Sequence, residues 1–98
     1  MILEVAILNV RAGQEAGFEA AFRDAQSIVA AANGYLSHEL KRCIEKPGRY
    51  VLLVTWQTLE DHTQGFRGSP AYAEWKNRLH HFYDPFPTVE HYVDVSSS

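Results

Sequence analysis

The strongest strand signal in the chain is the stretch YVLLVTWQ, residues 50–57. Its β-branched and aromatic residues favour an extended backbone. Successive side chains of a strand point to opposite faces, and here both faces are largely apolar. A strand with one wet face would place polar residues there, so this strand predicts that something covers each side of the sheet. The two faces are Tyr50, Leu52, Val54, Trp56 and Val51, Leu53, Thr55, Gln57.

Helical and strand signals follow on both sides of this stretch. Apolar residues recur at three and four positions before the turn at Asn33-Gly34, which is typical of an amphipathic helix and its C-terminal cap. Ser69 followed by Pro70 is typical of a helix start. The predicted elements are a strand 2–10, a helix 14–32, a strand 35–45, the strand 50–57, a short helix 58–67, a helix 70–82 and a strand 88–95.

The order β-α-β-β-α-β is that of the ferredoxin-like, split βαβ motif. It predicts an α+β fold with a four-stranded antiparallel sheet and helices on one face. If Leu52 and Trp56 meet the helices, Val51, Leu53 and Val93 lie on the open face. A second copy of the sheet is the simplest cover for that apolar face. We therefore expect a homodimer whose two sheets face each other.

Length and composition indicate one small globular domain. The 98 residues are 46% hydrophobic and 21% charged, and they predict a single domain over 1–95 with a polar tail at 96–98. The net charge of −3 argues against nucleic-acid binding, and the single cysteine, Cys43, excludes an internal disulfide. Neither a metal signature, a membrane span nor a signal peptide is recognisable, so we expect a cytoplasmic protein without a bound metal.

Two short motifs after the central strand resemble a known family. The stretch LEDH, residues 59–62, follows the tryptophan of that strand, and SPAY, residues 69–72, comes next. This arrangement resembles the antibiotic biosynthesis monooxygenase family of dimeric α+β barrel proteins, over residues 2–95. The resemblance implies a monooxygenase that uses O₂ without metal, flavin or haem on a phenolic, anthrone or quinol substrate. Such a substrate reduces O₂ directly once it is deprotonated, so the protein has to bind, orient and deprotonate it.

His62 is our first choice for the base among five histidines. It lies near a helix start, where the dipole disfavours the cation, although Glu60 and Asp61 act in the opposite direction. A neutral imidazole is the form that a general base needs. The alternative is a surface histidine on an exposed helix face. His38 is interpreted as a hydrogen-bonded histidine of the core or an interface, and His91 as a candidate for contact with a partner subunit.

The substrate-binding candidates combine aromatic and polar side chains. Trp56, Phe66 and Tyr72 would form the cavity wall, because aromatic residues line ligand pockets. Asn9 and Arg67 would orient the substrate, Arg67 by attracting a phenolate or carboxylate. Structural alternatives stand beside these roles: a core position for Trp56, a core edge for Tyr72, a solvated charge for Arg67 and a strand end for Asn9.

Two departures from the family pattern bear on the reaction. Leu52 stands where the aromatic hydroxylases of this type carry an asparagine. The haem-degrading branch requires a tryptophan and a histidine at positions that are Phe66 and Lys76 here, so haem degradation is disfavoured. The alternative from another class is a non-catalytic small-molecule binder or a stress-related dimer. A solvent-reaching hollow with polar groups favours the enzyme, and a filled, dry core favours the binder.

Overall fold

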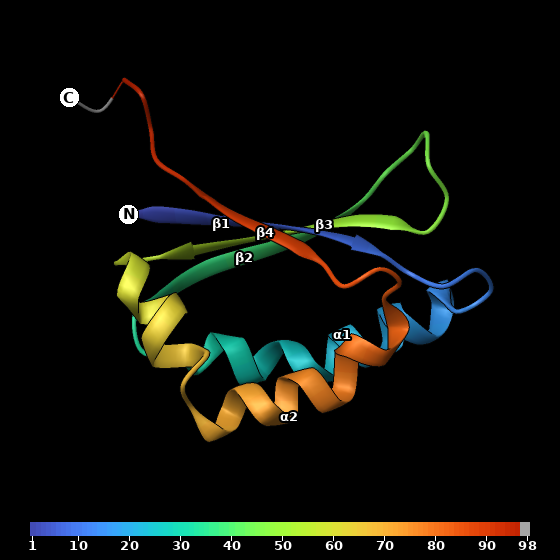
Figure 1. Ribbon diagram of the computed structural model, residues 1–98, viewed down its shortest axis with the longest axis horizontal. Coiled ribbons are helices and arrows are strands. Elements are labelled where there is room, and N and C mark those ends of the chain that lie inside the picture. Colours follow the sequence, from blue (N-terminus) through green and yellow to red (C-terminus); the bar gives the residue numbers. More distant parts are fainter. Residues whose placement is uncertain (97–98) are drawn as a thin grey trace.

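The computed structural model describes residues 1–96, so Ser97 and Ser98 of the predicted tail lie outside the described part. Four strands form one antiparallel sheet in the order β2-β3-β1-β4, and the helices lie on one side of it (Figure 1). This confirms the predicted ferredoxin-like fold. The elements are β1 (Ile2–Asn9), α1 (Glu15–Ala30), β2 (Tyr35–Arg42), β3 (Arg49–Trp56), the π-helix η1 (Asp61–Phe66), α2 (Pro70–Leu79), the 3₁₀ turn η2 (His80–Phe82) and β4 (Thr88–Tyr92).

The register of the central strands separates an inner from an outer sheet face. Ala6 of β1 lies opposite Leu52 of β3, and both are buried beneath the helices. The predicted inner face of β3 is thereby confirmed. The outer face has an apolar centre flanked by polar edge strands. We call this centre the outer apolar stripe; it consists of the partly exposed residues Leu3, Val5, Ile7, Val51 and Leu53.

A β-bulge changes the predicted faces of the first two residues of β2, Tyr35 and Leu36. Tyr35 lies opposite Trp56 and His38 lies opposite Val54, with a register shift between Tyr35 and Ser37. The extra residue of the bulge breaks the alternation, so Leu36 is 43% exposed instead of sharing the inner face with His38. Strict alternation over 35–45 predicts Leu36 on the face of His38 and Tyr35 on the opposite face; both predictions were wrong because alternation cannot anticipate a bulge.

The structure also moves several predicted element ends. The short helix expected over 58–67 is the π-helix η1, and the second helix changes to 3₁₀ geometry after Leu79. The last strand ends at Tyr92, so Val93 lies beyond the sheet and is 66% exposed, which contradicts its predicted place on the open face. Such segments carry weak periodicity, and element ends are the least certain part of a sequence pattern.

Gly34 fixes how η1 meets the end of α1. Its φ of 81° is a left-handed conformation, and a Cβ at this position would collide with the carboxyl group of Asp61. Asp61 in turn accepts hydrogen bonds from the backbone N–H and the hydroxyl of Thr58. This junction places the start of η1 beside the end of β3.

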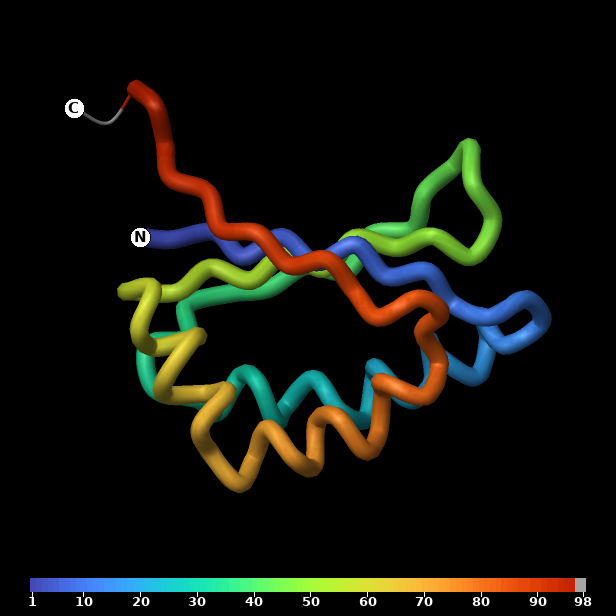
Figure 2. The backbone as a smooth tube through the Cα atoms, in the orientation of Figure 1, coloured from blue at the N-terminus to red at the C-terminus, as the bar shows by residue number. Residues whose placement is uncertain are grey.

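The two helices run side by side beneath the sheet (Figure 2). Helix α1 fills its side of the core with Phe18, Phe22, Ala25 and Val29, all buried. Within residues 1–96, neither helix combines the length and the apolar character that a bilayer crossing requires.

Candidate active site

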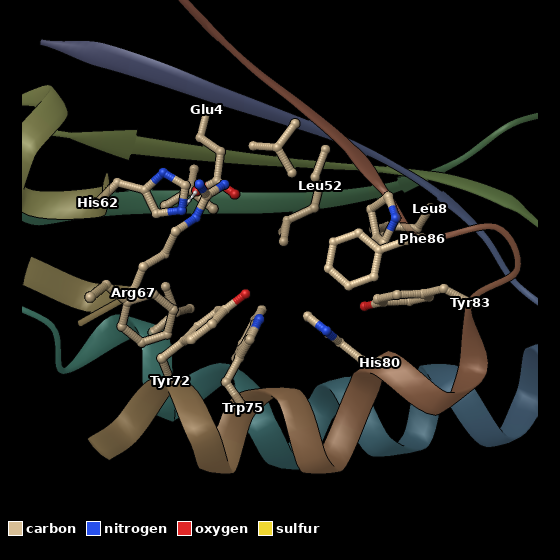
Figure 3. Close-up of a pocket in the computed structure, with 16 residues that line it drawn as sticks. Glu4, Leu8, Leu52, His62, Arg67, Tyr72, Trp75, His80, Tyr83 and Phe86 are labelled. Atoms are coloured by element: carbon tan, nitrogen blue, oxygen red, sulfur yellow. Dashed lines mark ion pairs between the residues drawn. The ribbon is translucent and has the colours of Figure 1, made fainter. Parts of the chain in front are cut away.

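A cavity of about 350 Å³ lies between the inner sheet face and α2 (Figure 3). Strands β1 and β3 form its ceiling, while η1, α2 and the segment between η2 and β4 form its sides. Arg67 and Phe86 contribute to the lining and are both exposed, so the cavity reaches the surface. Its volume falls within the range of pockets that hold small organic ligands.

Aromatic side chains form the walls of this cavity. Phe66 meets Tyr72 and Trp75 edge-on, with ring centroids 5.5 and 6.0 Å apart. At the other end the ring of His80 lies 5.6 Å from that of Tyr83 and 5.3 Å from that of Phe86. These rings offer the faces and edges against which a flat ring system packs.

A chain of hydrogen-bonding groups closes one end of the cavity. The indole N–H of Trp56 donates to Glu4 Oε1 over 3.0 Å. The same oxygen lies 3.4 Å from His62 Nε2, and His62 Nδ1 lies 2.8 Å from His91 Nε2. Glu4 and His91 are opposite each other in the β1–β4 register, so the sheet itself brings them together. We call these four residues the polar cluster.

Burial controls the protonation of this cluster. It lowers the pKa of His62 to about 3, with further lowering by the charge of Arg67 and by His91. Burial raises the pKa of Glu4, against the hydrogen bond from Trp56 and the charge of Arg67. His62 is therefore neutral at pH 7. The sequence argument predicted a lowered pKa from a helix dipole, whereas the largest cause in the structure is desolvation.

Four of the six predicted site residues line the cavity: His62, Phe66, Arg67 and Tyr72. Figure 3 shows the Arg67 side chain extended toward Glu4, and the Tyr72 hydroxyl directed into the hollow.

Trp56 does not line the cavity. It is fully buried behind His62, on which it stacks with ring centroids 5.2 Å apart and an angle of 19° between the planes. The structure therefore supports the core interpretation of Trp56, and its contribution to the site passes through Glu4 and His62.

Asn9 also lies away from the cavity. Its Oδ1 accepts a hydrogen bond from Arg49 Nε over 3.3 Å. Asn9 shares the parity of Val5 and Ile7, which face away from the helices, so the structure does not bring it to the other candidates. The prediction of Asn9 as a substrate-orienting residue is therefore corrected. Side chains alternate between the two faces of a strand, and Asn9 falls on the face away from the cavity.

Sequence reasoning missed Glu4 and did not foresee the bond between His91 and His62. Glu4 is the only charged residue in the apolar stretch 2–10 and shares its face with Ala6 and Leu8, which is a signal that was present in the sequence. His91, a candidate for contact with a partner subunit, bonds His62 within the chain. His38 is hydrogen-bonded to Tyr35 and Gln26, as predicted. Among residues 1–96, no three His, Cys, Asp or Glu side chains gather as a possible metal site.

The chain belongs to the antibiotic biosynthesis monooxygenase family, whose model matches residues 1–78. It is 55% identical over 95 residues to the uncharacterized protein YczJ of Bacillus subtilis (strain 168), covering 97% of this chain and 100% of that one. A crystal structure with the same family description from Bordetella bronchiseptica has 36% identity and a TM-score of 0.92, with 96% of each chain covered. SnoaB, a cofactor-independent oxygenase from Streptomyces nogalater, shares the fold at 22% identity and a TM-score of 0.75, covering 99% of this chain and 93% of that one.

Proposed function

We propose that this protein is a cofactor-independent monooxygenase that uses O₂ to oxidise a small hydroxylated aromatic or quinol. The observation that carries the proposal is a solvent-reaching cavity with aromatic walls that ends in the polar cluster beside Arg67. Such a hollow with polar groups favours the enzyme over a stress-related dimer with a filled, dry core, whereas a small-molecule binder would use the same hollow and is separated from the enzyme by turnover. The family and the printed activity of SnoaB support the same reaction class.

The proposed reaction needs no external reductant. The deprotonated substrate gives electrons to O₂, and a carbon–oxygen bond forms to give a peroxide. The O–O bond then breaks, one oxygen atom stays on the substrate carbon and the other leaves as water. The substrate loses two hydrogens and gains one oxygen, which balances the reaction. The protein has to orient the ring, accept a proton and stabilise an oxyanion.

The lining residues divide these tasks. Phe66 and Tyr72 hold the ring between aromatic surfaces, with Trp56 as a buried support. The guanidinium of Arg67 stabilises the phenolate or enolate oxygen, because among residues 1–96 it has no carboxylate within ion-pair distance. His62, neutral and joined to Glu4, belongs to the group that accepts the proton.

Oxygen uptake by the purified, metal-free protein tests this function. A panel of hydroquinols and anthrones is compared with its own autoxidation rate, and ¹⁸O₂ is used to label the product. We expect uptake well above autoxidation, one labelled oxygen in the product and a loss of uptake in His62→Ala. Retained uptake in that variant would remove His62 from the reaction but leave the enzyme. No uptake on any substrate, with ligand binding intact, would point to the binding protein instead.

We further propose that the protein is a homodimer joined through the outer apolar stripe. Its five aliphatic residues are partly exposed and belong to the sheet face that the helices leave uncovered (Figure 1). Sedimentation equilibrium should give twice the chain mass, and Val5→Lys should give a monomer, because an unpaired charge is costly in an apolar interface. A monomeric wild type would contradict this assembly.

A further inference from the structure

We propose that Glu4, through its Oε2 atom, is the group that takes the proton from the substrate, while His62 and His91 hold it in position. This inference rests on the proposed function and assigns the base within that site. Glu4 is buried in β1 and lines the cavity at the same end as Arg67.

The hydrogen bonding of His62 carries the first step. A neutral imidazole has one donor and one acceptor nitrogen. Nδ1 is hydrogen-bonded to His91 Nε2 at 2.8 Å, and Nε2 points at Glu4 Oε1 from 3.4 Å, so both ring nitrogens face other members of the cluster. A substrate hydroxyl reaches a lone pair on His62 only if one of these contacts breaks. His62 therefore serves better as a positioning residue than as the direct acceptor.

The two oxygens of Glu4 have different surroundings. Oε1 accepts from Trp56 and faces His62. Among residues 1–96, Oε2 has no hydrogen-bond partner, and the side chain lines the cavity. A carboxylate held by one oxygen offers the other to an incoming O–H donor, which forms a short, charge-assisted hydrogen bond.

The charge of Arg67 is balanced by an anion both before and after a proton moves from the substrate to Glu4. Before transfer, the cation of Arg67 faces an ionised Glu4, and afterwards it faces the substrate oxyanion while the carboxyl is neutral. The other groups around Glu4 are His62 of η1, His91 of β4 and the hydroxyl of Tyr72 of α2, which lines the same cavity. Burial raises the pKa of Glu4 above its ordinary value and lowers that of His62 to about 3, so the carboxylate is a stronger proton acceptor than His62.

The step is balanced within the site. The substrate O–H bond breaks, its electron pair stays on the substrate oxygen, and the proton forms a carboxylic acid at Oε2. When the O–O bond of the peroxide breaks later, this proton goes to the departing oxygen and becomes part of the water. The proton is thus stored on the carboxyl group and returned within the same reaction cycle.

Three variants and a matched control test the assignment by turnover. Glu4→Gln keeps an acceptor for the Trp56 N–H but cannot take a proton, so kcat/KM should fall by about 100-fold or more. The fall of kcat/KM at low pH reports protonation of the base. Glu4→Asp should retain this fall, and Glu4→Gln should lose it. His62→Gln should lower kcat more than it changes KM and should shift the pH of this fall, which a merely structural role would not do. Glu60→Gln, at an exposed position, should match the wild type.

Binding of 4-nitrophenol gives a readout without turnover. In the wild type we expect the long-wavelength absorption of the bound phenolate together with a new carboxylic-acid band in the infrared difference spectrum. Glu4→Gln should bind the neutral phenol and show no such band. The wild-type spectrum alone remains decisive if the glutamine variant does not fold.

The outcomes separate this inference from the proposed function. Full turnover in Glu4→Gln, or bound phenolate without the carboxyl band, would overturn the role of Glu4 and leave the monooxygenase intact. A phenolate with the band but no oxygen uptake on any substrate would support Glu4 as a proton acceptor and refute the oxygenase.

Discussion

The two helices of this protein cover the same sheet in opposite ways. Helix α1 turns four buried residues toward the sheet, and Phe18 packs edge-on against Tyr50 at 4.9 Å between ring centroids. Helix α2 buries only Trp75 and Leu79, and a cavity remains between it and the sheet. Close packing under α1 supplies stability, whereas the space under α2 supplies a place for a ligand.

The largest stability loss should follow from opening the packed side. Phe18 is fully buried against the rings of Phe22, Tyr50, Phe82 and Tyr83. Phe18→Ala should lower the free energy of unfolding by about 3–5 kcal/mol, because the lost burial adds to the cost of a cavity. Urea denaturation followed by circular dichroism measures this change.

A phenylalanine on the hollow side is the matched control. Phe86 lines the cavity but is 71% exposed. Phe86→Ala should change the unfolding free energy by about 0.5 kcal/mol or less. Similar losses at both positions would show that α2 and its following segment are packed as firmly as α1.

Removing an arginine should lower turnover on the cavity side, under α2, but not on the packed side, under α1. Arg67→Gln should lower kcat/KM about 10- to 100-fold, which corresponds to the loss of one charge-assisted hydrogen bond to the substrate oxyanion. Arg42, which lies 3.6 Å from Glu19 on the α1 side, provides the control. Oxygen uptake by Arg42→Gln should match the wild type, and an equal loss in both variants would refute a specific role for Arg67.

Acidification should reveal the buried histidine. The folded-state pKa of His62 is about 3, below its unfolded value of about 6.5, so the unfolded chain binds the proton first. Stability from this group is present above pH 6.5 and is lost as the pH falls toward 3, with a slope of up to about 1.4 kcal/mol per pH unit. Glu4 contributes the opposite sign, because its raised pKa favours folding until the pH rises through that value.

Denaturation midpoints between pH 4 and 7 test this linkage. His62→Gln should have a shallower dependence of unfolding free energy on pH than the wild type. His81→Gln, at an exposed position, should keep the wild-type slope. Parallel curves for the wild type and His62→Gln would show that His62 is not buried as a neutral group.

A small effect on both stability and ligand affinity is expected at the start of α2. The hydroxyl of Ser69 accepts from the backbone N–H of Tyr72 and donates to the carbonyl of Phe66. Ser69→Ala should cost about 1 kcal/mol of unfolding free energy, as typical for an N-cap. A slight loss of ligand affinity should accompany it, because both bonded residues line the cavity, whereas Ser27→Ala on the exposed side of α1 should leave affinity unchanged.

Several features of the site were predictable because they follow from local patterns. His62, Phe66, Arg67 and Tyr72 come from the short segment 62–72, so one motif places them near one another. Asn9 was misjudged because both faces of β1 are largely apolar, so the sequence does not tell which face meets the helices; the structure turns the face of Glu4 toward the cavity. The contact of His91 with the site was not predictable, because its register with Glu4 depends on long-range strand pairing.

The sequence by itself determined the element order, the ferredoxin-like sheet and the buried face of β3, because these depend on periodicity and turn residues that are local. Only the tertiary structure decided that α2 leaves a hollow and that Glu4, His62 and His91 meet at its end. Their contacts join residues from three separate elements, and desolvation, which sets their protonation, exists only once those elements pack together.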